Sequence, residues 1–311
     1  MGYKVSFAGT GRIAYSFANQ ILNSGGEICG ISNRTDKNAN LFSQKFNLNL
    51  DNLGINYLPQ DTNVFVLSVP DSSIQTVAEQ LSLNDLDFNG KIVLHLSGAI
   101  DSSVLDSVAQ KGAVTGAVHL PQTFPDNTII SLQNSFASIE TSNQSNFAEI
   151  KKFTDFLGLR TFEIKAKFKP LYHLTAVFVS NFLNSNIFVA KEFFTLTGND
   201  DSNFYEIYKN IITKTAENII TKKLPGSISG PVKRKEIETI NSHISNILNS
   251  DIKPEINKLL YLNSYLTQSA ILIKALSENG EDEFSSIQKL INEKLILVCG
   301  LLQDELKREN K

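Results

Sequence analysis

The sequence contains no tryptophan, one methionine and only two cysteines among its 311 residues. The cysteines, Cys29 and Cys299, lie near opposite ends of the chain, without the close spacing of a metal site. Both stand within apolar runs, so we expect buried, reduced thiols. The four histidines include no His-x-x-x-His pair, and no Cys-x-x-Cys occurs. The sequence therefore predicts no metal centre.

Basic charge and long apolar runs are also missing. The net charge is −3, whereas a nucleic-acid-binding surface needs a basic surplus. No apolar run approaches the ~20 residues of a membrane span. The G-x-S-x-G turn of many hydrolases is absent, because His95 and Ala99 stand where glycines would flank Ser97. We therefore expect a cytoplasmic globular protein that acts on a small molecule, with no nucleic-acid or membrane partner.

The first half alternates short β-rich runs with helix-length segments. Runs such as VFVLSV and IVLHL are continuously apolar, which is typical of parallel strands covered by helices on both faces. Expected strands are Lys4–Ala8, Glu27–Ile31, Asn63–Val69, Lys91–Leu96 and Val114–His119, and expected helices are Ile13–Asn23, Asn38–Phe46, Ser72–Leu81 and Ser102–Gln110. One more strand–helix–strand unit over residues 137–164 completes a Rossmann-like, doubly wound α/β domain with a parallel sheet.

Long amphipathic segments replace the strands in the second half. Expected helices are Pro170–Leu196, Asn203–Lys222, Lys233–Asn249, Pro254–Leu276 and Phe284–Lys307. The sequence thus predicts two domains: a dinucleotide-binding domain over residues 1–166, and an all-α domain over residues 167–311 that serves substrate binding and dimerisation.

A glycine-rich turn follows the first expected strand and reads Gly9-Thr10-Gly11-Arg12-Ile13-Ala14. A glycine pair alone is weak evidence, because a turn after a strand needs no ligand. Here a helix follows directly, and a second strand ends about 20 residues further on, which is the spacing of a dinucleotide-binding βαβ unit. We favour a pyrophosphate cradle, in which the free amides that open the helix face the anion.

The end of the second expected strand bears on which dinucleotide binds. A carboxylate there would bind the ribose hydroxyls of NAD, but the chain offers Asn33, Arg34 and Thr35. An arginine suits the 2′-phosphate of NADP, since it supplies directed donors and a permanent charge. NADP is therefore favoured. The alternative is that Arg34 is a solvated loop residue and that Asp36 binds the ribose of NAD.

Two further strand ends are expected at the same edge of the sheet, where ligands of open α/β sheets bind. Val69 and Pro70 end the third strand, and Ser97 and Gly98 follow the fourth. We expect all four to contact the cofactor. The stretch PDSS also reads as a helix start with Asp71 or Ser72 as the N-cap. His95, inside the run IVLHL, is interpreted as a satisfied core histidine.

The order of motifs GTGRIA, VPDSSI, HLSGAI, HLPQTF, YHLTAVFVSNFL and SGPVKRKE resembles a known family. It is the Rossmann-like oxidoreductase-type family with a C-terminal domain of unknown function. That family is similar in build to pyrroline-5-carboxylate reductase and to 6-phosphogluconate and β-hydroxyacid dehydrogenases. The resemblance implies an NADP-binding domain, a helical dehydrogenase-type domain and a homodimer formed through the C-terminal helices. One departure is His119-Leu120-Pro121-Gln122, where the family usually has His-Pro-Leu-Gln; we still expect His119 and Gln122 near the cleft.

The first long helix carries the densest polar set. At 3.6 residues per turn, His173, Ser180 and Asn181 share one stripe. We predict that His173 or His119 moves a proton, because histidine ordinarily titrates near neutrality, and that Asn181 orients the substrate. Tyr172 is interpreted as a packing residue with a hydrogen-bonded tip. The stripe could also be a plain interface or solvent face.

Related β-hydroxyacid dehydrogenases carry a lysine four residues before the helix asparagine, and Val177 stands there in this chain. This departure argues against ordinary alcohol oxidation of that type.

Three cations, Lys233, Arg234 and Lys235, stand at the expected start of a later helix, where they oppose its dipole. A bound anion would relieve the conflict; alternatively, Glu236 and Glu238 neutralise a solvated face.

Taken together, these features lead us to hypothesise an NADP-dependent oxidoreductase for a small anionic carbonyl, imine or hydroxyl substrate at the interdomain cleft. The alternative is an NADP-binding sensor without turnover.

Overall fold

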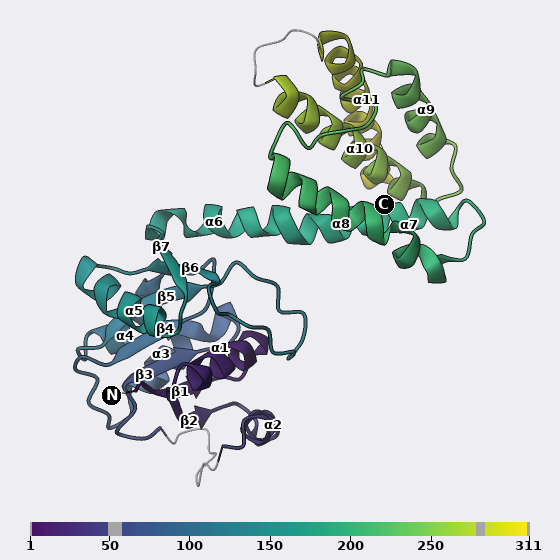
Figure 1. The fold of residues 1–311 in the computed structure, drawn as a ribbon. Helices are drawn as coiled ribbons and strands as arrows, with labels where there is room; N and C mark the ends of the chain where they lie inside the picture. Colours follow the sequence, from purple (N-terminus) through teal and green to yellow (C-terminus); the bar gives the residue numbers. More distant parts are fainter. Residues whose placement is uncertain (1, 49–57, 278–283, 310–311) are drawn as a thin grey trace. The chain divides into compact units, whose positions relative to one another are not determined.

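The computed structural model describes residues 2–48, 58–277 and 284–309 (Figure 1). The chain forms two compact units, residues 1–183 and 184–311. The first unit holds a seven-stranded sheet with its helices, and the described part of the second unit is helical. The α/β class and the helical second region predicted from the sequence are confirmed. Among the described residues, no helix combines the length and apolar character that crossing a bilayer requires.

The sheet has the strand order β2-β1-β3-β4-β5-β6-β7. The strands are β1 (Lys4–Ala8), β2 (Glu27–Ser32), β3 (Val64–Leu67), β4 (Ile92–His95), β5 (Val114–His119), β6 (Phe136–Glu140) and β7 (Arg160–Glu163). The first five are mutually parallel, as predicted. The strand order reverses between β1 and β3, so their carboxyl ends form the switch point at which such sheets bind ligands.

The last two strands depart from the all-parallel prediction. β6 runs antiparallel to β5, and β7 runs parallel to β6. The physical reason is the link over residues 120–135, which contains no helix. A parallel pair needs a crossover connection, usually a helix, to bring the chain back to the starting edge. Without one, β6 returns in the opposite direction.

Helices cover both faces of the sheet, because alternate strand residues point to opposite sides. Val5 and Phe7 pack in one apolar cluster, whereas Ala8 packs in the other. The first cluster includes residues of α1 (Arg12–Asn23), α2 (Asp36–Lys45) and α5 (Gln144–Phe156). The second includes residues of α3 (Ile74–Ser82) and of the short turns η2 (Ser102–Leu105) and α4 (Asp106–Ala109). Burial on both faces explains the continuous apolar runs in the sequence.

The first long helix is interrupted. It comprises α6 (Lys169–Ala176), a π turn (Val177–Asn181) and α7 (Phe182–Thr195). A π turn bonds i to i+5, so side chains beyond it are rotated relative to a continuous α-helix. The stripe predicted at 3.6 residues per turn therefore does not hold across it. The first unit includes α6 and the π turn, which follow the predicted boundary at 166/167; that boundary stays a prediction.

The second unit has its own apolar core. Its helices are α8 (Phe204–Lys222), α9 (Ile237–Leu248), α10 (Glu255–Ser277) and α11 (Ser285–Glu309). Side chains of α9, α10 and α11 form the core, with Val232 and Phe284 from the preceding segments.

The expected burial of the two cysteines is wrong. Cys299 is exposed, and Cys29 in the first unit is only partly buried, although neither forms a disulfide. Apolar neighbours in the sequence did not indicate burial, because Ile296 and Leu297 on α11 are themselves exposed.

The three cations predicted to open a helix also lie elsewhere, since α9 begins only at Ile237. Arg234 Nε donates to Glu236 Oε1 at 2.7 Å, and Lys233 Nζ donates to Ile228 O at 3.0 Å. Lys235 Nζ lies 5.1 Å from the centroid of the Phe284 ring. Because the three cations precede α9, the dipole of that helix does not oppose them. Glu236 neutralises Arg234 as the alternative predicted, and an anion site at these residues stays a prediction.

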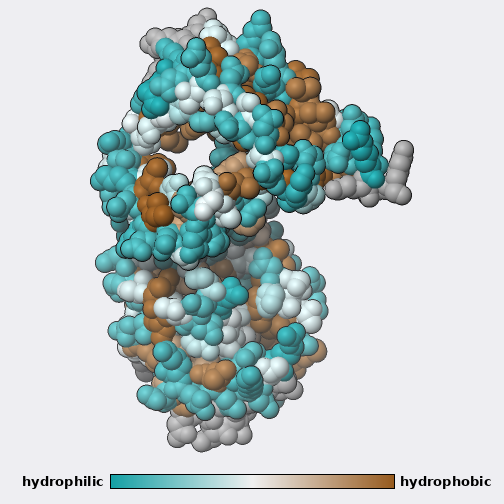
Figure 2. All heavy atoms as spheres, turned by 90° about the vertical axis from the view of Figure 1, so that its right-hand side faces the viewer, coloured by the Kyte–Doolittle hydropathy of each residue, from teal (hydrophilic) through white to brown (hydrophobic). Residues whose placement is uncertain are grey.

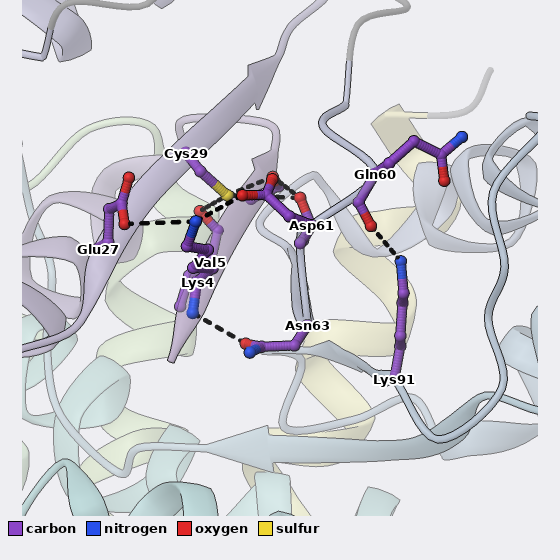
Figure 3. Close-up of polar contacts among 10 residues, drawn as sticks. Lys4, Val5, Glu27, Cys29, Gln60, Asp61, Asn63 and Lys91 are labelled. Atoms are coloured by element: carbon purple, nitrogen blue, oxygen red, sulfur yellow. Dashed lines mark hydrogen bonds and ion pairs between the residues drawn. The ribbon is translucent and has the colours of Figure 1, made fainter. Parts of the chain in front are cut away.

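The amino-terminal edge of the sheet is fastened by polar contacts (Figure 3). Lys4 N donates to Asn63 Oδ1 at 2.8 Å, and the Lys4 ammonium pairs with Asp61. Directly before β4, Lys91 Nζ donates to Gln60 O at 2.7 Å. These groups satisfy one another.

Candidate functional site

The glycine turn after β1 lies where β1, β2 and β3 end together. Gly9 adopts a φ of +85°, a conformation that L side chains rarely take. Its amide donates to Ser32 O at the end of β2, at 2.7 Å. A Cβ atom at Gly9 would lie 2.5 Å from Ser68 O beyond β3. Only glycine fits this turn without displacing backbone.

Gly11 brings the start of α1 close to the end of β3. Its amide donates to Ser68 O at 3.3 Å, and a Cβ atom would lie 3.1 Å from that oxygen. Ser68 Oγ is buried without a hydrogen-bond partner among the described residues. No side chain caps α1, and its first turn, beginning at Arg12 and Ile13, contains no acidic residue. An uncapped helix start beside a buried, unpaired hydroxyl fits a pyrophosphate.

The loop after β2 reaches the glycine turn through its own contacts. Asn33 Nδ2 donates to Thr10 Oγ1 at 2.5 Å, and Arg34 N donates to Asn33 Oδ1 at 2.9 Å. The Arg34 side chain is exposed. Thr35 is the N-cap position of α2, and Asp36 stands in the first turn of that helix. A carboxylate there favours the helix dipole, which gives Asp36 a structural role.

The turn after β4 uses most of its polar groups internally. Ser97 N donates to His95 Nδ1 at 3.2 Å, and His95 Nε2 lies 3.2 Å from Asp101 O. His95 is thus a fully buried histidine with both ring nitrogens paired, which confirms its interpretation as a core residue. Since Nδ1 accepts a hydrogen bond from an N–H group, it carries no proton, and the ring is neutral. Burial, followed by the charge of Lys169, lowers the pKa of His95 to about 4.

Asp71, which follows β3, contacts the turn after β4 and does not act as an N-cap. Neither the 3₁₀ turn at Asp71–Ser73 nor α3 has a side-chain cap, so that reading is wrong. Instead, Ser97 Oγ donates to Asp71 Oδ2 at 2.8 Å. Ser97 Oγ also accepts hydrogen bonds from Ala99 N at 3.2 Å and from Ile100 N at 3.1 Å. Ser97 therefore shapes the turn after β4. Pro70, directly before Asp71, is exposed.

Gly98 is the point at which two predicted proton carriers meet. A Cβ atom at Gly98 would lie 2.8 Å from His119 Nε2 and 2.9 Å from His173 Nδ1. The two imidazole centroids are 6.2 Å apart. His173 Nδ1 is buried and has no hydrogen-bond partner among the described residues. An unpaired buried ring nitrogen is a position at which a substrate group could bond.

Lys169 is the important residue that the sequence analysis missed. It is 1% exposed, and its Nζ donates to Ser97 O at 2.9 Å. Burial lowers the pKa of Lys169 to about 8, against the attraction of Glu140, Asp101 and Asp71. A signal was present, because a lysine in the first turn of a helix opposes the dipole.

Tyr172 and Asn181 differ in how they relate to the histidines. Tyr172 Oη lies 2.9 Å from His119 Nδ1, which confirms its hydrogen-bonded tip. Asn181 is exposed at the end of the π turn. No described contact ties it to His119 or His173. The structure therefore joins the two histidines and Gly98 in one group, without Asn181.

Family comparisons agree with this architecture. Residues 2–120 match the Rossmann-like domain, and residues 135–264 match a domain of unknown function, DUF2520. The chain thus combines a Rossmann-like domain with a DUF2520 domain, and the resemblance stated from the motifs is confirmed. No protein of curated function matches the sequence.

Solved structures share the fold at low identity. A candidate NADP oxidoreductase from Bacteroides fragilis is 20% identical, over 85% of this chain and 97% of that chain, with a TM-score of 0.66. A reductive aminase from Aspergillus terreus, in complex with NADPH4, cyclohexanone and allyl amine, is 12% identical over 94% and 93%, with a TM-score of 0.54. Prephenate dehydrogenase from A. aeolicus, with hydroxyphenyl propionate and NAD+, is 14% identical over 96% and 99%, with a TM-score of 0.52.

The glycine turn generates a stability prediction. Gly9→Ala should lower the free energy of unfolding more than Gly90→Ala, measured by urea denaturation. Gly90 also has a positive φ, +70°, but a Cβ atom there meets nothing within 4 Å. Gly90→Ala should therefore cost only the ~1–2 kcal/mol of the left-handed conformation. Gly9→Ala adds the clash with Ser68 O. Equal losses in the two variants would show that the close approach at Gly9 is relieved without cost.

Proposed function

We propose that the chain is an NADP-dependent oxidoreductase that acts on a small carbonyl, imine or hydroxyl compound. The observation that carries the proposal is the glycine turn at the β1/β3 switch point. Among the described residues, no side chain caps the start of α1 beside this turn. The fold shared with a reductive aminase solved with a reduced nicotinamide cofactor is consistent with it. The case for an anionic substrate depends on Lys233–Lys235 opening a helix. Because these residues precede α9 and Arg234 is paired with Glu236, negative charge is left out of the proposal.

The choice of NADP over NAD rests on the loop after β2. Arg34 is exposed directly beyond the strand, and Asn33 holds its backbone beside Thr10 of the glycine turn. Asp36, the residue that would suit NAD, is already part of α2. A guanidinium at this place would bond the 2′-phosphate with charged donors.

The reaction would take place beside Gly98. When bound, a reduced nicotinamide supplies a hydride to the substrate carbon. A proton must then reach the carbonyl oxygen or imine nitrogen. His173 is the residue that we assign to this transfer, since its Nδ1 is buried and unpaired next to Gly98.

A second candidate function is an NADP-binding sensor without turnover. Val177 favours it, because related dehydrogenases have a lysine at this helix position and this chain has an apolar side chain. The two functions share the cofactor site and differ only in chemistry. Oxidation of NADPH in the presence of keto acids or cyclic imines would reject the sensor.

Arg34→Ala should weaken NADPH binding selectively. Loss of charged hydrogen bonds to the 2′-phosphate would cost about 1.5–3 kcal/mol, and NADH binding should be unchanged. Nicotinamide fluorescence titration measures both affinities. Lys37→Ala is the matched control, since it removes an exposed cation of α2 close by in sequence. An equal loss for NADPH and NADH would remove Arg34 from this role.

His173→Ala should lower kcat for NADPH oxidation by about 10²–10⁴-fold, the usual contribution of a positioned acid or base. NADPH affinity should change little. The control is His243→Ala, which removes an exposed histidine of the second unit. Turnover equal to that of the unsubstituted protein would exclude His173 as the proton carrier.

We also propose that the second unit forms a homodimer. Ile207 and Ile211 lie one turn apart on α8 and are 57% and 61% exposed. Apolar side chains, drawn brown, are visible on the surface of the helical unit in Figure 2.

Light scattering should give twice the chain mass, and Ile211→Glu should reduce the measured mass to that of one chain. Leu83→Glu, at an exposed apolar residue of the first unit, is the control. A monomeric unsubstituted protein would contradict the proposal.

A further inference from the structure

The ring of His119 is fixed from one side by a chain of hydroxyl groups. His119 Nδ1 lies 2.9 Å from Tyr172 Oη, and the two rings meet edge to face with centroids 5.4 Å apart. Ser138, the partner of His119 in the β5–β6 pair, also hydrogen-bonds Tyr172, although burial, the larger effect, raises the pKa of the tyrosine. A tyrosine hydroxyl both accepts and donates, so it can accept from Ser138 and donate its hydrogen bond to Nδ1 of His119.

With Tyr172 as the donor, this arrangement sets the tautomer of His119. When Nδ1 accepts the hydrogen bond of the Tyr172 hydroxyl, a neutral ring carries its own proton on Nε2. Nε2 is the nitrogen that faces Gly98, 2.8 Å from where a Cβ atom would stand. Its N–H is then directed to the same point as the unpaired Nδ1 of His173.

Lys169 opposes a second proton on this ring. Burial, then the Lys169 charge and then His173 lower the pKa of His119 to about 4. The ammonium is anchored to Ser97 O at 2.9 Å. The carboxylates of Glu140 on β6, Asp101 and Asp71 attract Lys169 through their charge. His95 is the other titratable group near the ammonium, whose charge lowers the pKa of this imidazole. Its positive charge is therefore held at Ser97 O, where it acts on the ring of His119.

We propose that His119 hydrogen-bonds the substrate's carbonyl oxygen or imine nitrogen as a neutral Nε2–H donor, with Tyr172 and Lys169 as positioning residues that hold it in this state. The assignment rests on the proposed oxidoreductase function. It divides the work of the two histidines: His119 polarises the acceptor and keeps its proton, whereas His173 supplies the proton that balances the hydride. It also explains why a buried lysine lies at the first position of α6, one turn before His173.

The state of His119 can be measured without ligand. Long-range ¹H–¹⁵N spectra of the full chain, labelled in histidine, report which ring nitrogen carries the proton and the titration midpoint. The signal is assigned by its loss in His119→Gln. We expect the Nε2–H tautomer at pH 7 and a midpoint of about 4, below the ordinary 6.5. A midpoint near 6.5, or an Nδ1–H tautomer, would overturn the proposal.

Variants separate the two positioning residues. Lys169→Met keeps the shape of the side chain and removes the charge, so the imidazolium is less disfavoured and the midpoint should rise by about one unit or more. Lys169→Arg should keep the His119 midpoint low, and Lys167→Met, at an exposed lysine of the preceding segment, should not change the midpoint.

Tyr172→Phe should give a mixture of His119 tautomers. An unchanged midpoint in Lys169→Met or an unchanged tautomer in Tyr172→Phe would also overturn it. If Lys169→Met does not fold, the unsubstituted protein and Tyr172→Phe still decide.

Failure of this proposal differs from failure of the proposed function. Absence of NADPH binding and turnover would reject the oxidoreductase and leave the measured tautomer intact. Turnover that depends on His173, together with a His119 midpoint near 6.5, would reject only the role given to His119.

Discussion

The close approach of backbone at the ends of β1, β2 and β3 is the constraint on which the candidate site depends. Gly9 N donates to Ser32 O at 2.7 Å, Ser68 N to Ala8 O at 2.8 Å, and Gly11 N to Ser68 O at 3.3 Å. These bonds join three strand ends to the start of α1. Neither glycine leaves room for a side chain toward Ser68 O. The amides of the helix start and the loop after β2 are consequently held in one place.

A second group of contacts organises the turn after β4. His95, Asp71 and Lys169 satisfy the amide, hydroxyl and carbonyl of Ser97. The side-chain atoms nearest to a Cβ atom placed at Gly98 belong to His119 and His173. A buried lysine is costly to keep charged, as its lowered pKa shows. After burial, its charge is the next cause that lowers the pKa of His119.

Much of the fold could be predicted from residue patterns. β1 and β5 have the predicted bounds, and the glycine turn falls between the predicted strand and helix. These features are local: continuous apolar runs specify strands buried on both faces, and glycine specifies the left-handed turn. Prediction failed where the backbone departed from regular geometry, as in the π turn at Val177–Asn181 and the late start of α9 at Ile237. It also failed for Cys299, since local apolarity does not show which helix face is covered.

The sequence by itself determined the class of fold, the cradle at Gly9–Ala14 and the histidines worth considering, because each depends on neighbouring residues or on helical and strand periods. Only the tertiary structure decided which of these residues meet. His119, at the end of β5, and His173, on α6, come together at Gly98 because strand order and helix packing place them there. Lys169 gained its importance in the same way, since burial and the contact with Ser97 O arise between segments far apart in the chain.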